Sequence, residues 1–240
     1  MIYIENIFVC IAIPMLLSLF FTEHRQRVFT LFVVAGMAIC LLAAYVNSFF
    51  MNYYQTNATT TMIEITPVCE EVMKLLPLLF YFLIFEPEKK QVTNAALALS
   101  VGFATFENAC YLTENGASQF SFLLIRGISA GAVHILCGIL IGCGMAYVFY
   151  HRWLRLTGTI GLVGACIILH ASYNLLITAD GIWRRIGYVF PSLLILLLFL
   201  ARHLLIPGIL PSEAQQTASS GRSEERRVGK ECRSRWSPYH

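Results

Sequence analysis

Long apolar segments separated by short polar breaks make up most of this chain. Seven of these segments are long enough to cross a bilayer, because about 20 helical residues span its hydrocarbon core. They are residues 4–21, 28–49, 63–85, 92–112, 120–150, 158–177 and 186–206. The pattern predicts an all-α fold: a polytopic transmembrane helical bundle of about seven spans.

The apolar pattern stops after residue 210. Residues 1–210 are predicted to form a single integral membrane domain, with its core at residues 63–177. Residues 211–240 are rich in Ser, Gln, Glu and Arg and show no apolar periodicity, so we expect a disordered tail. Its last part, residues 221–240, differs from everything before it and is interpreted as a non-native cloning or assembly scar.

The composition agrees with a membrane protein. Of the 240 residues, 57% are hydrophobic and 13% are charged, roughly half the charge fraction of soluble domains. The formal net charge is only +3, without the basic patch that a nucleic-acid binder needs. The expected partners are therefore the lipid bilayer and other membrane proteins, and not nucleic acid.

The basic residues of the short loops predict an orientation in the cell membrane. Lys and Arg gather in cytoplasmic loops, and three alternate loops carry six of them: Arg25, Arg27, Lys89, Lys90, Arg152 and Arg155. The opposite loops carry only Arg184 and Arg185. We therefore expect an extracytoplasmic N-terminus and a cytoplasmic C-terminus.

Charged residues interrupt the third apolar segment. Glu70, Glu71 and Lys74 lie within residues 63–85, where an ionisable group costs several kcal/mol unless it is paired or hydrated. On a helix Lys74 can reach either carboxylate, at i,i+4 or i,i+3. One carboxylate can then be structural and the other reactive, although a purely structural ion pair stays possible on this spacing.

The next three segments each add polar groups. Glu107 lies near the outer end of residues 92–112, His134 lies in an apolar context, and His170 and Asn174 share one helix face at i,i+4. Each has a structural alternative: a glutamate that reaches water, a hydrogen-bonded core histidine, or an interhelical polar clamp. Arg126 is expected to pair with a carboxylate or to reach lipid headgroups.

Glycines recur at helical spacing in two of the segments. They are Gly127, Gly131, Gly138 and Gly142 in residues 120–150, and Gly158, Gly161 and Gly164 in residues 158–177. Small residues let membrane helices approach closely, so we expect tight helix contacts along these faces.

Depth connects the polar groups. At about 1.5 Å per residue, Glu70, Glu107 and His170 lie roughly 8–10 Å below the outer ends of their segments, and His134 about 16–21 Å. Helices of alternating direction thus bring these groups to one level of the membrane. Scattered structural residues would have no reason to share it.

The set of side chains indicates hydrolysis. Two neutral histidines and a glutamate (His134, His170 and Glu70) suit Zn²⁺ and leave a position for water, and a second glutamate can act as general base. Without metal, Glu and His can polarise water directly while Asn174 donates to an oxyanion. The chain has no His-Glu-x-x-His motif and a single aspartate, Asp180, which excludes a two-aspartate site.

At this point the residues resemble the PrsW-like family of intramembrane proteases, within the superfamily of CAAX prenyl proteases and bacteriocin-processing enzymes. The resemblance covers residues 63–177 and rests on an ordered set of motifs: Glu70-Glu71-x-x-Lys74, Phe103-x-x-Phe106-Glu107-Asn108, His134 and His170-x-x-x-Asn174. The superfamily's usual Arg is Lys74 here, as in the PrsW-like branch, which argues against a CAAX-processing role.

The resemblance implies site-one cleavage of a membrane-anchored anti-sigma factor, a single-pass membrane protein. It implies that Glu70, Glu71, His134 and His170 are catalytic and that Asn174 helps to stabilise an oxyanion. Our hypothesis adds Glu107 as a supporting residue or additional ligand. Metal-dependent and glutamate-dependent mechanisms both stay open.

Two other classes of function fit some of the same residues. A proton-coupled membrane transporter also uses intramembrane Glu and His. No clear inverted repeat supports that reading. A non-enzymatic membrane binding protein would use the glycine faces and would leave the carboxylates and histidines unexplained.

Overall fold

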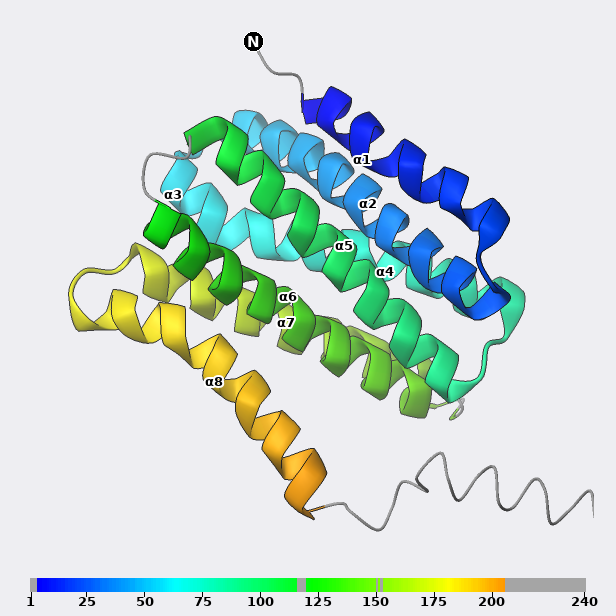
Figure 1. Ribbon diagram of the computed structural model, residues 1–240. Coiled ribbons are helices and arrows are strands. Elements are labelled where there is room, and N and C mark those ends of the chain that lie inside the picture. The colour runs from blue at the N-terminus through cyan, green and yellow to red at the C-terminus, as the bar shows by residue number, and fades with distance from the viewer. Residues whose placement is uncertain (1–3, 116–119, 150, 152, 206–240) are drawn as a thin grey trace, which may run out of the picture. The chain divides into compact units, whose positions relative to one another are not determined.

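The computed structural model describes residues 4–115, 120–149, 151 and 153–205, and within these residues every regular element is a helix. The elements in chain order are α1 (Ile4–Ser18), the 3₁₀ turn η1 (Leu19–Phe21), α2 (His24–Tyr54), α3 (Ala58–Thr60), the π-helix η2 (Thr61–Ile65), α4 (Thr66–Phe85), α5 (Lys89–Asn115), α6 (Phe120–Val148), α7 (Leu154–Thr178) and α8 (Ile182–Leu205). The all-α prediction is confirmed (Figure 1).

The chain divides into two units, residues 1–195 and 196–240. The first unit holds α1 to α7 and the start of α8. Of the second unit only residues 196–205, the end of α8, are described. The predicted tail at 211–240, with its suspected scar at 221–240, lies outside the described residues, and the domain limits stay a prediction.

Within the described part of the chain, six helices are long and apolar enough to cross a membrane. They begin at Ile4, His24, Lys89, Ser121, Leu154 and Ile182. Helix α4 has the length of a span, 20 residues, but carries three charged side chains in its first half. With α4 included, the described residues match the predicted bundle of about seven spans.

Helices α2, α5 and α7 extend beyond their apolar segments at both ends. Helix α2 begins at His24 and ends at Tyr54, beyond the predicted 28–49, and it stops where Gln55 adopts a left-handed φ of 53°. Helix α8 begins at Ile182, four residues before the predicted start. Hydropathy marks the lipid-buried part of a helix, whereas the backbone hydrogen bonds continue into the polar ends.

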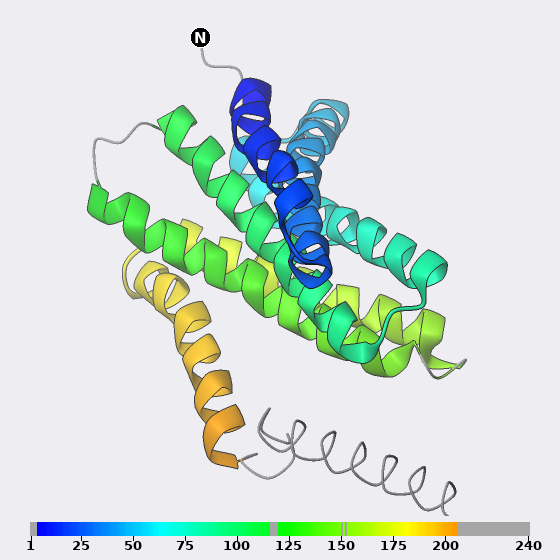
Figure 2. The same cartoon turned by 45° about the vertical axis from the view of Figure 1, so that its right-hand side comes forward.

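Helix α5 lies between α2 and α6 (Figures 1 and 2). The α2–α5 crossing is so close that a Cβ at Gly36 would lie 2.0 Å from the Leu99 carbonyl oxygen. One at Gly102 would lie 1.9 Å from the Val33 carbonyl oxygen. The sequence analysis missed this pair. A single glycine on each helix gives no repeat to recognise.

The predicted glycine faces are only partly in contact. A Cβ at Gly138 would meet Ser100, and one at Gly142 would meet Ala96, so the close approach of α5 and α6 is confirmed there. A Cβ at Gly131, Gly161 or Gly164 would have no such neighbour within 4 Å, and the prediction is wrong at these positions. Spacing alone does not say which glycines face another helix.

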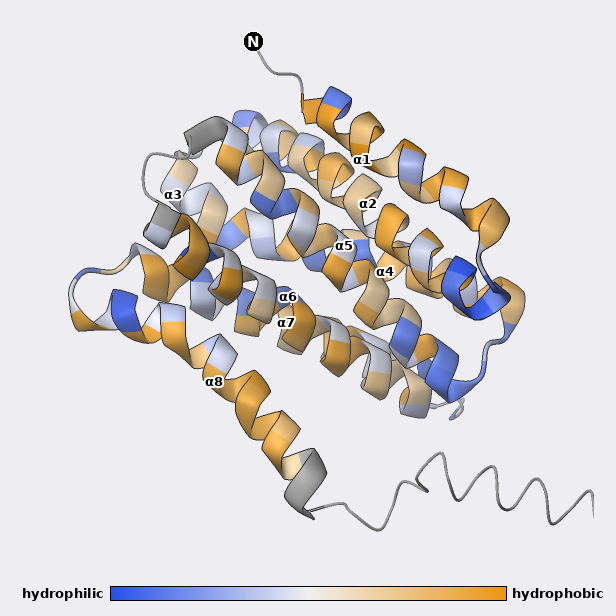
Figure 3. Ribbon diagram, viewed as in Figure 1, coloured by the Kyte–Doolittle hydropathy of each residue, from blue (hydrophilic) through white to orange (hydrophobic). Residues whose placement is uncertain are grey.

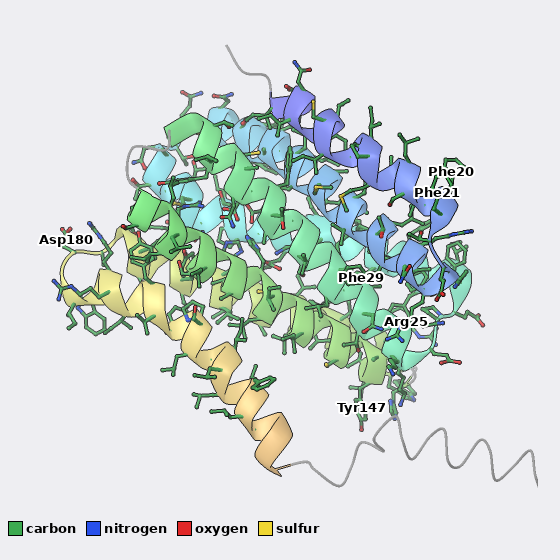
Figure 4. The ribbon with its side chains drawn as sticks, in the orientation of Figure 1. Phe20, Phe21, Arg25, Phe29, Tyr147 and Asp180 are labelled. Atoms are coloured by element: carbon green, nitrogen blue, oxygen red, sulfur yellow. The ribbon has the colours of Figure 1, made fainter. Side chains whose placement is uncertain are left out.

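The outer surface of the bundle is apolar, as a lipid-facing surface must be (Figure 3). Large side chains such as Phe80, Leu156 and Ile168 are more than 60% exposed. The two ends differ: Asp180 lies at one end, and Arg25 and Tyr147 lie at the other (Figure 4). The loops α2–α3 and α7–α8 share the Asp180 end (Figure 1).

Candidate active site

Helix α4 carries three charged side chains into the interior. Glu70, Glu71 and Lys74 keep only 7%, 3% and 5% of their surface exposed. The helix begins with Pro67 in its first turn, where the missing N–H has no intrahelical partner to lose. Glu70 and Glu71 thus lie in the second turn of α4, close to the end of the bundle where that helix starts.

The carboxylate of Glu71 accepts two hydrogen bonds through the same oxygen. Lys74 Nζ lies 2.7 Å from Oε1, and His170 Nδ1 of α7 lies 2.9 Å from it. The buried carboxylate is therefore neutralised from its own helix and hydrogen-bonded by a second one. The expected ion pair between Lys74 and one of the paired glutamates forms with Glu71.

A chain of polar contacts continues from Lys74 through α6. Lys74 Nζ lies 3.0 Å from His134 Nδ1, and His134 Nε2 lies 2.7 Å from Glu107 Oε2. An ammonium can only donate, so Nδ1 accepts and Nε2 carries the proton that is donated to Glu107. The sequence analysis missed the contact between Lys74 and His134, because helices 60 residues apart give no spacing rule.

Glu107 also contacts Arg126, a partly buried residue of α6. Arg126 donates to Glu107 Oε1 at 3.2 Å, and its guanidinium lies 3.6 Å from the ring centre of Tyr111. Of the two expectations for Arg126, pairing with a carboxylate is confirmed. An arginine stacked on an aromatic face in this way is held in one orientation.

Glu70 differs from its neighbour. Its Oε2 is buried and has no hydrogen-bond partner among the described residues. The nearest basic group is His170 Nε2, 3.9 Å away. The rings of His134 and His170 lie edge to face with centres 5.1 Å apart. An unpaired buried acceptor is costly, so this oxygen is available to a bound metal ion or to a hydrogen-bond donor of a substrate.

These residues fit a divalent metal ion. Glu70, His134 and His170 each offer one ligand atom, and the three atoms lie within 4.8 Å of one another. Two imidazoles and a carboxylate form a known zinc ligand set. His170 is ready to bind through Nε2, since its Nδ1 is used by Glu71. Both nitrogens of His134 are in contact with other side chains, Lys74 and Glu107, so His134 must give up one of these contacts before it can bind an ion.

A second cluster fits a metal less well. Glu71, Cys137 and Cys166 also lie within 4.8 Å of one another. Each thiol, however, faces the backbone carbonyl of the other cysteine, at 3.7 and 3.6 Å, and the carboxylate is neutralised by Lys74. We interpret this cluster as part of the packing between α6 and α7.

Asn174 lies one turn beyond His170 on α7. Its side-chain nitrogen donates to the Met62 carbonyl oxygen at 2.8 Å, which ties α7 to the π-helix ahead of α4. This role was not foreseen. The predicted contribution to an oxyanion hole stays a prediction, and the amide nitrogen has a second hydrogen to donate.

The structure therefore brings five of the six predicted residues into one connected cluster: Glu70, Glu71, Glu107, His134 and His170. Asn174 lines a cavity with both histidines without bonding to them. Four helices, α4 to α7, supply the cluster. The fold and the site define a multi-pass membrane protein with a buried Glu/His centre of hydrolytic type.

Comparison with protein families agrees with this class. The model of the PrsW family intramembrane metalloprotease matches residues 23–201, and the chain belongs to this family. It is a membrane-embedded peptidase, so the transporter and binding-protein alternatives are set aside. Comparisons with curated proteins and with solved structures gave no match.

Proposed function

We propose that this peptidase performs site-one cleavage of a membrane-anchored regulator, a single-pass protein of the anti-sigma factor type, with Glu70, His134 and His170 at the reacting centre. The observation that carries the proposal is the unpaired Oε2 of Glu70, buried 3.9 Å from His170 Nε2. The family supports the peptidase class. The anti-sigma substrate is our inference from the resemblance.

Glu70, His134 and His170 would hold the metal ion, for which we propose Zn²⁺. A bound Zn²⁺ acts as a Lewis acid, the chemistry by which metallopeptidases use water at neutral pH. Glu71 fixes the His170 ring by accepting from its Nδ1. Carboxylate partners of this kind orient metal-binding histidines and make them more basic.

The other polar residues orient His134 and stabilise the negative charge that develops on the carbonyl oxygen. Lys74 and Glu107 contact the two nitrogens of the His134 ring, and one of these contacts would be given up when His134 binds the ion. The second hydrogen of the Asn174 amide, which lines the same cavity as the two histidines, would donate to the developing oxyanion. Water adds across the C–N bond: its oxygen joins the carbonyl carbon, and the nitrogen leaves as an amine after gaining a proton.

We propose that the site faces the extracytoplasmic half of the membrane, with the N-terminus outside and the C-terminus in the cytoplasm. At the α1–α2 and α4–α5 end, the first turns of α2 and α5 carry Arg25, Arg27, Lys89 and Lys90. At the other end Arg184 pairs with Asp180 at 2.9 Å. In intact cells, a membrane-impermeant thiol reagent should label Thr59→Cys and spare Glu88→Cys; the reverse pattern would refute this orientation.

Proteolysis is tested on purified protein in lipid vesicles. A single-pass reporter, built on an anti-sigma factor, is incubated with the wild type and with Glu70→Gln, His134→Ala and His170→Ala variants. The matched control is His151→Ala, an exposed histidine after α6. We expect cleavage by the wild type and the control only. Equal cleavage by all variants would refute the assignment of the site.

A further inference from the structure

Two cavities meet at the candidate active site. The first, here called the α2 cavity, has a volume of about 350 Å³ and is lined by residues of α1 and α2 together with Glu70 and Glu107. The second, the α7 cavity, has a volume of about 210 Å³ and is lined by residues of α6, α7 and α8, including both histidines. Together they fall in the range of ligand sites, about 300–1,000 Å³.

One group of residues belongs to both cavities. Glu107, Tyr111 and Arg126 line each of them. The ion pair between Glu107 and Arg126, with Arg126 stacked on Tyr111, therefore stands between the two cavities. Glu70 is reached from one side of this partition, and His134 and His170 are reached from the other.

The α2 cavity contains unused hydrogen-bond acceptors. Both Oε2 of Glu70 and Oδ1 of Asn47 are buried without a hydrogen-bond partner among the described residues, and both residues line this cavity. Such atoms call for donors from a bound molecule. A peptide in extended form offers its backbone N–H groups, whereas a helix uses nearly all of them internally.

The α7 cavity has a different lining. Four aromatic residues, Tyr111, Phe122, Tyr173 and Tyr188, surround it beside Ile177. The Tyr173 hydroxyl is already bonded to Ser129 at 2.9 Å, which leaves its ring for the cavity. Aromatic walls of this kind favour a large apolar side chain.

We infer that the substrate lies across both cavities as an unwound, extended segment, with its scissile bond at the partition. The residues on one side of the bond occupy the α2 cavity, where Asn47 positions the backbone. A large apolar residue on the other side occupies the α7 cavity, where Tyr188 helps to select it. This inference rests on the proposed peptidase function and adds its substrate requirements.

The test uses a single-pass reporter whose scissile bond is located by mass spectrometry. Positions on both sides of that bond are then varied among Ala, Leu and Phe. We expect Tyr188→Ala to raise KM about tenfold for reporters with a large apolar residue, and to change the preference on one side of the bond only. Asn47→Ala should raise KM without altering that preference.

Matched controls separate these effects from general loss of structure. Trp183→Ala removes an exposed aromatic residue from the same helix as Tyr188, and Asn52→Ala removes an exposed amide from the same helix as Asn47. Both should cleave like the wild type. Tyr188→Phe, which keeps the ring, should restore the wild-type preference.

Three results are decisive. A change of preference on one side with Tyr188→Ala, together with a KM effect of Asn47→Ala, supports the inference. Unchanged preference and KM in both variants, with cleavage by the wild type intact, overturns the two-cavity arrangement and leaves the peptidase assignment standing. Failure of the wild type to cleave any reporter overturns both.

Discussion

Glu70 and Glu71 are neighbours in α4, yet only one of them is fully bonded. Glu71 accepts from Lys74 and His170 through Oε1, whereas Oε2 of Glu70 has no hydrogen-bond partner among the described residues. Adjacent residues on a helix point about 100° apart, so the two carboxylates face different neighbours. This difference supports our proposal that Glu71 has a supporting role and Glu70 a reactive role.

The two glutamates should therefore respond differently to the same substitution. Glu70→Gln replaces a proposed metal ligand whose Oε2 makes no hydrogen bond to the described residues, so we expect cleavage to fall by about 10²–10⁴-fold with little loss of stability. Glu71→Gln leaves Lys74 without its counter-ion and should destabilise the protein by about 3–5 kcal/mol. Thermal unfolding in detergent and reporter cleavage measure the two effects. Equal unfolding temperatures for both variants would contradict the division of roles.

Removal of the metal should stop the reaction. A chelator is expected to abolish cleavage, and Zn²⁺ should restore it, because Glu70, His134 and His170 form the ligand set. Metal analysis of the purified protein should find about one ion per chain, and none in His170→Ala. His151→Ala is the control. Full activity after complete removal of metal would instead favour direct activation of water by Glu70 and His170.

The rate of cleavage should depend on the planar shape of the Arg126 side chain as well as on its charge. Arg126→Lys keeps the charge but loses the planar stacking on Tyr111 and part of the contact with Glu107. We expect kcat/KM to fall about tenfold, and further in Arg126→Gln. Arg155→Lys, at an exposed position in the first turn of α7, is the matched control. Equal kinetics for Arg126→Lys and the wild type would argue against this role.

The α2–α5 crossing should tolerate no side chain. Gly102→Ala would put a Cβ 1.9 Å from the Val33 carbonyl oxygen, against backbone that cannot move independently of its helix. We expect a loss of at least about 1–3 kcal/mol. Gly161→Ala, where no neighbour lies within 4 Å, should be neutral or gain up to about 1 kcal/mol. Comparable unfolding temperatures for the two variants would be inconsistent with the crossing.

The sequence predicted the helices and the common level of the polar groups well. Rise per residue is nearly constant, so depth along a helix follows from counting, and Glu70, Glu107 and His170 do meet in one cluster. The rotation of each helix about its own axis could not be predicted from the sequence, because packing against other helices sets this rotation. Three findings therefore required the structure. They are the bond of Glu71 to His170, the contact of Lys74 with His134, and the absence of a close neighbour at Gly161 and Gly164 among the described residues.

The substrate site that we propose also includes residues ahead of the predicted core. That core was placed at residues 63–177, whereas Asn47 and Tyr45 of α2 line the α2 cavity together with Glu70. Nothing distinguishes Asn47 in the sequence from a polar residue at the end of a span. Its significance comes from a buried oxygen without a partner, which only side-chain coordinates reveal.

Because Thr61–Ile65 forms a π-helix, the number of residues between α3 and α4 determines how α4 is oriented relative to the preceding turn. The π-helix carbonyl at Met62 accepts from Asn174, and α4 follows directly. π-turns hold one residue more than the α-helix around them. Deleting a single residue here would restore α-helical pairing and rotate the preceding turn by about 100° relative to α4. Insertions and deletions should therefore be tolerated in the α2–α3 loop and rejected in the five residues that follow α3.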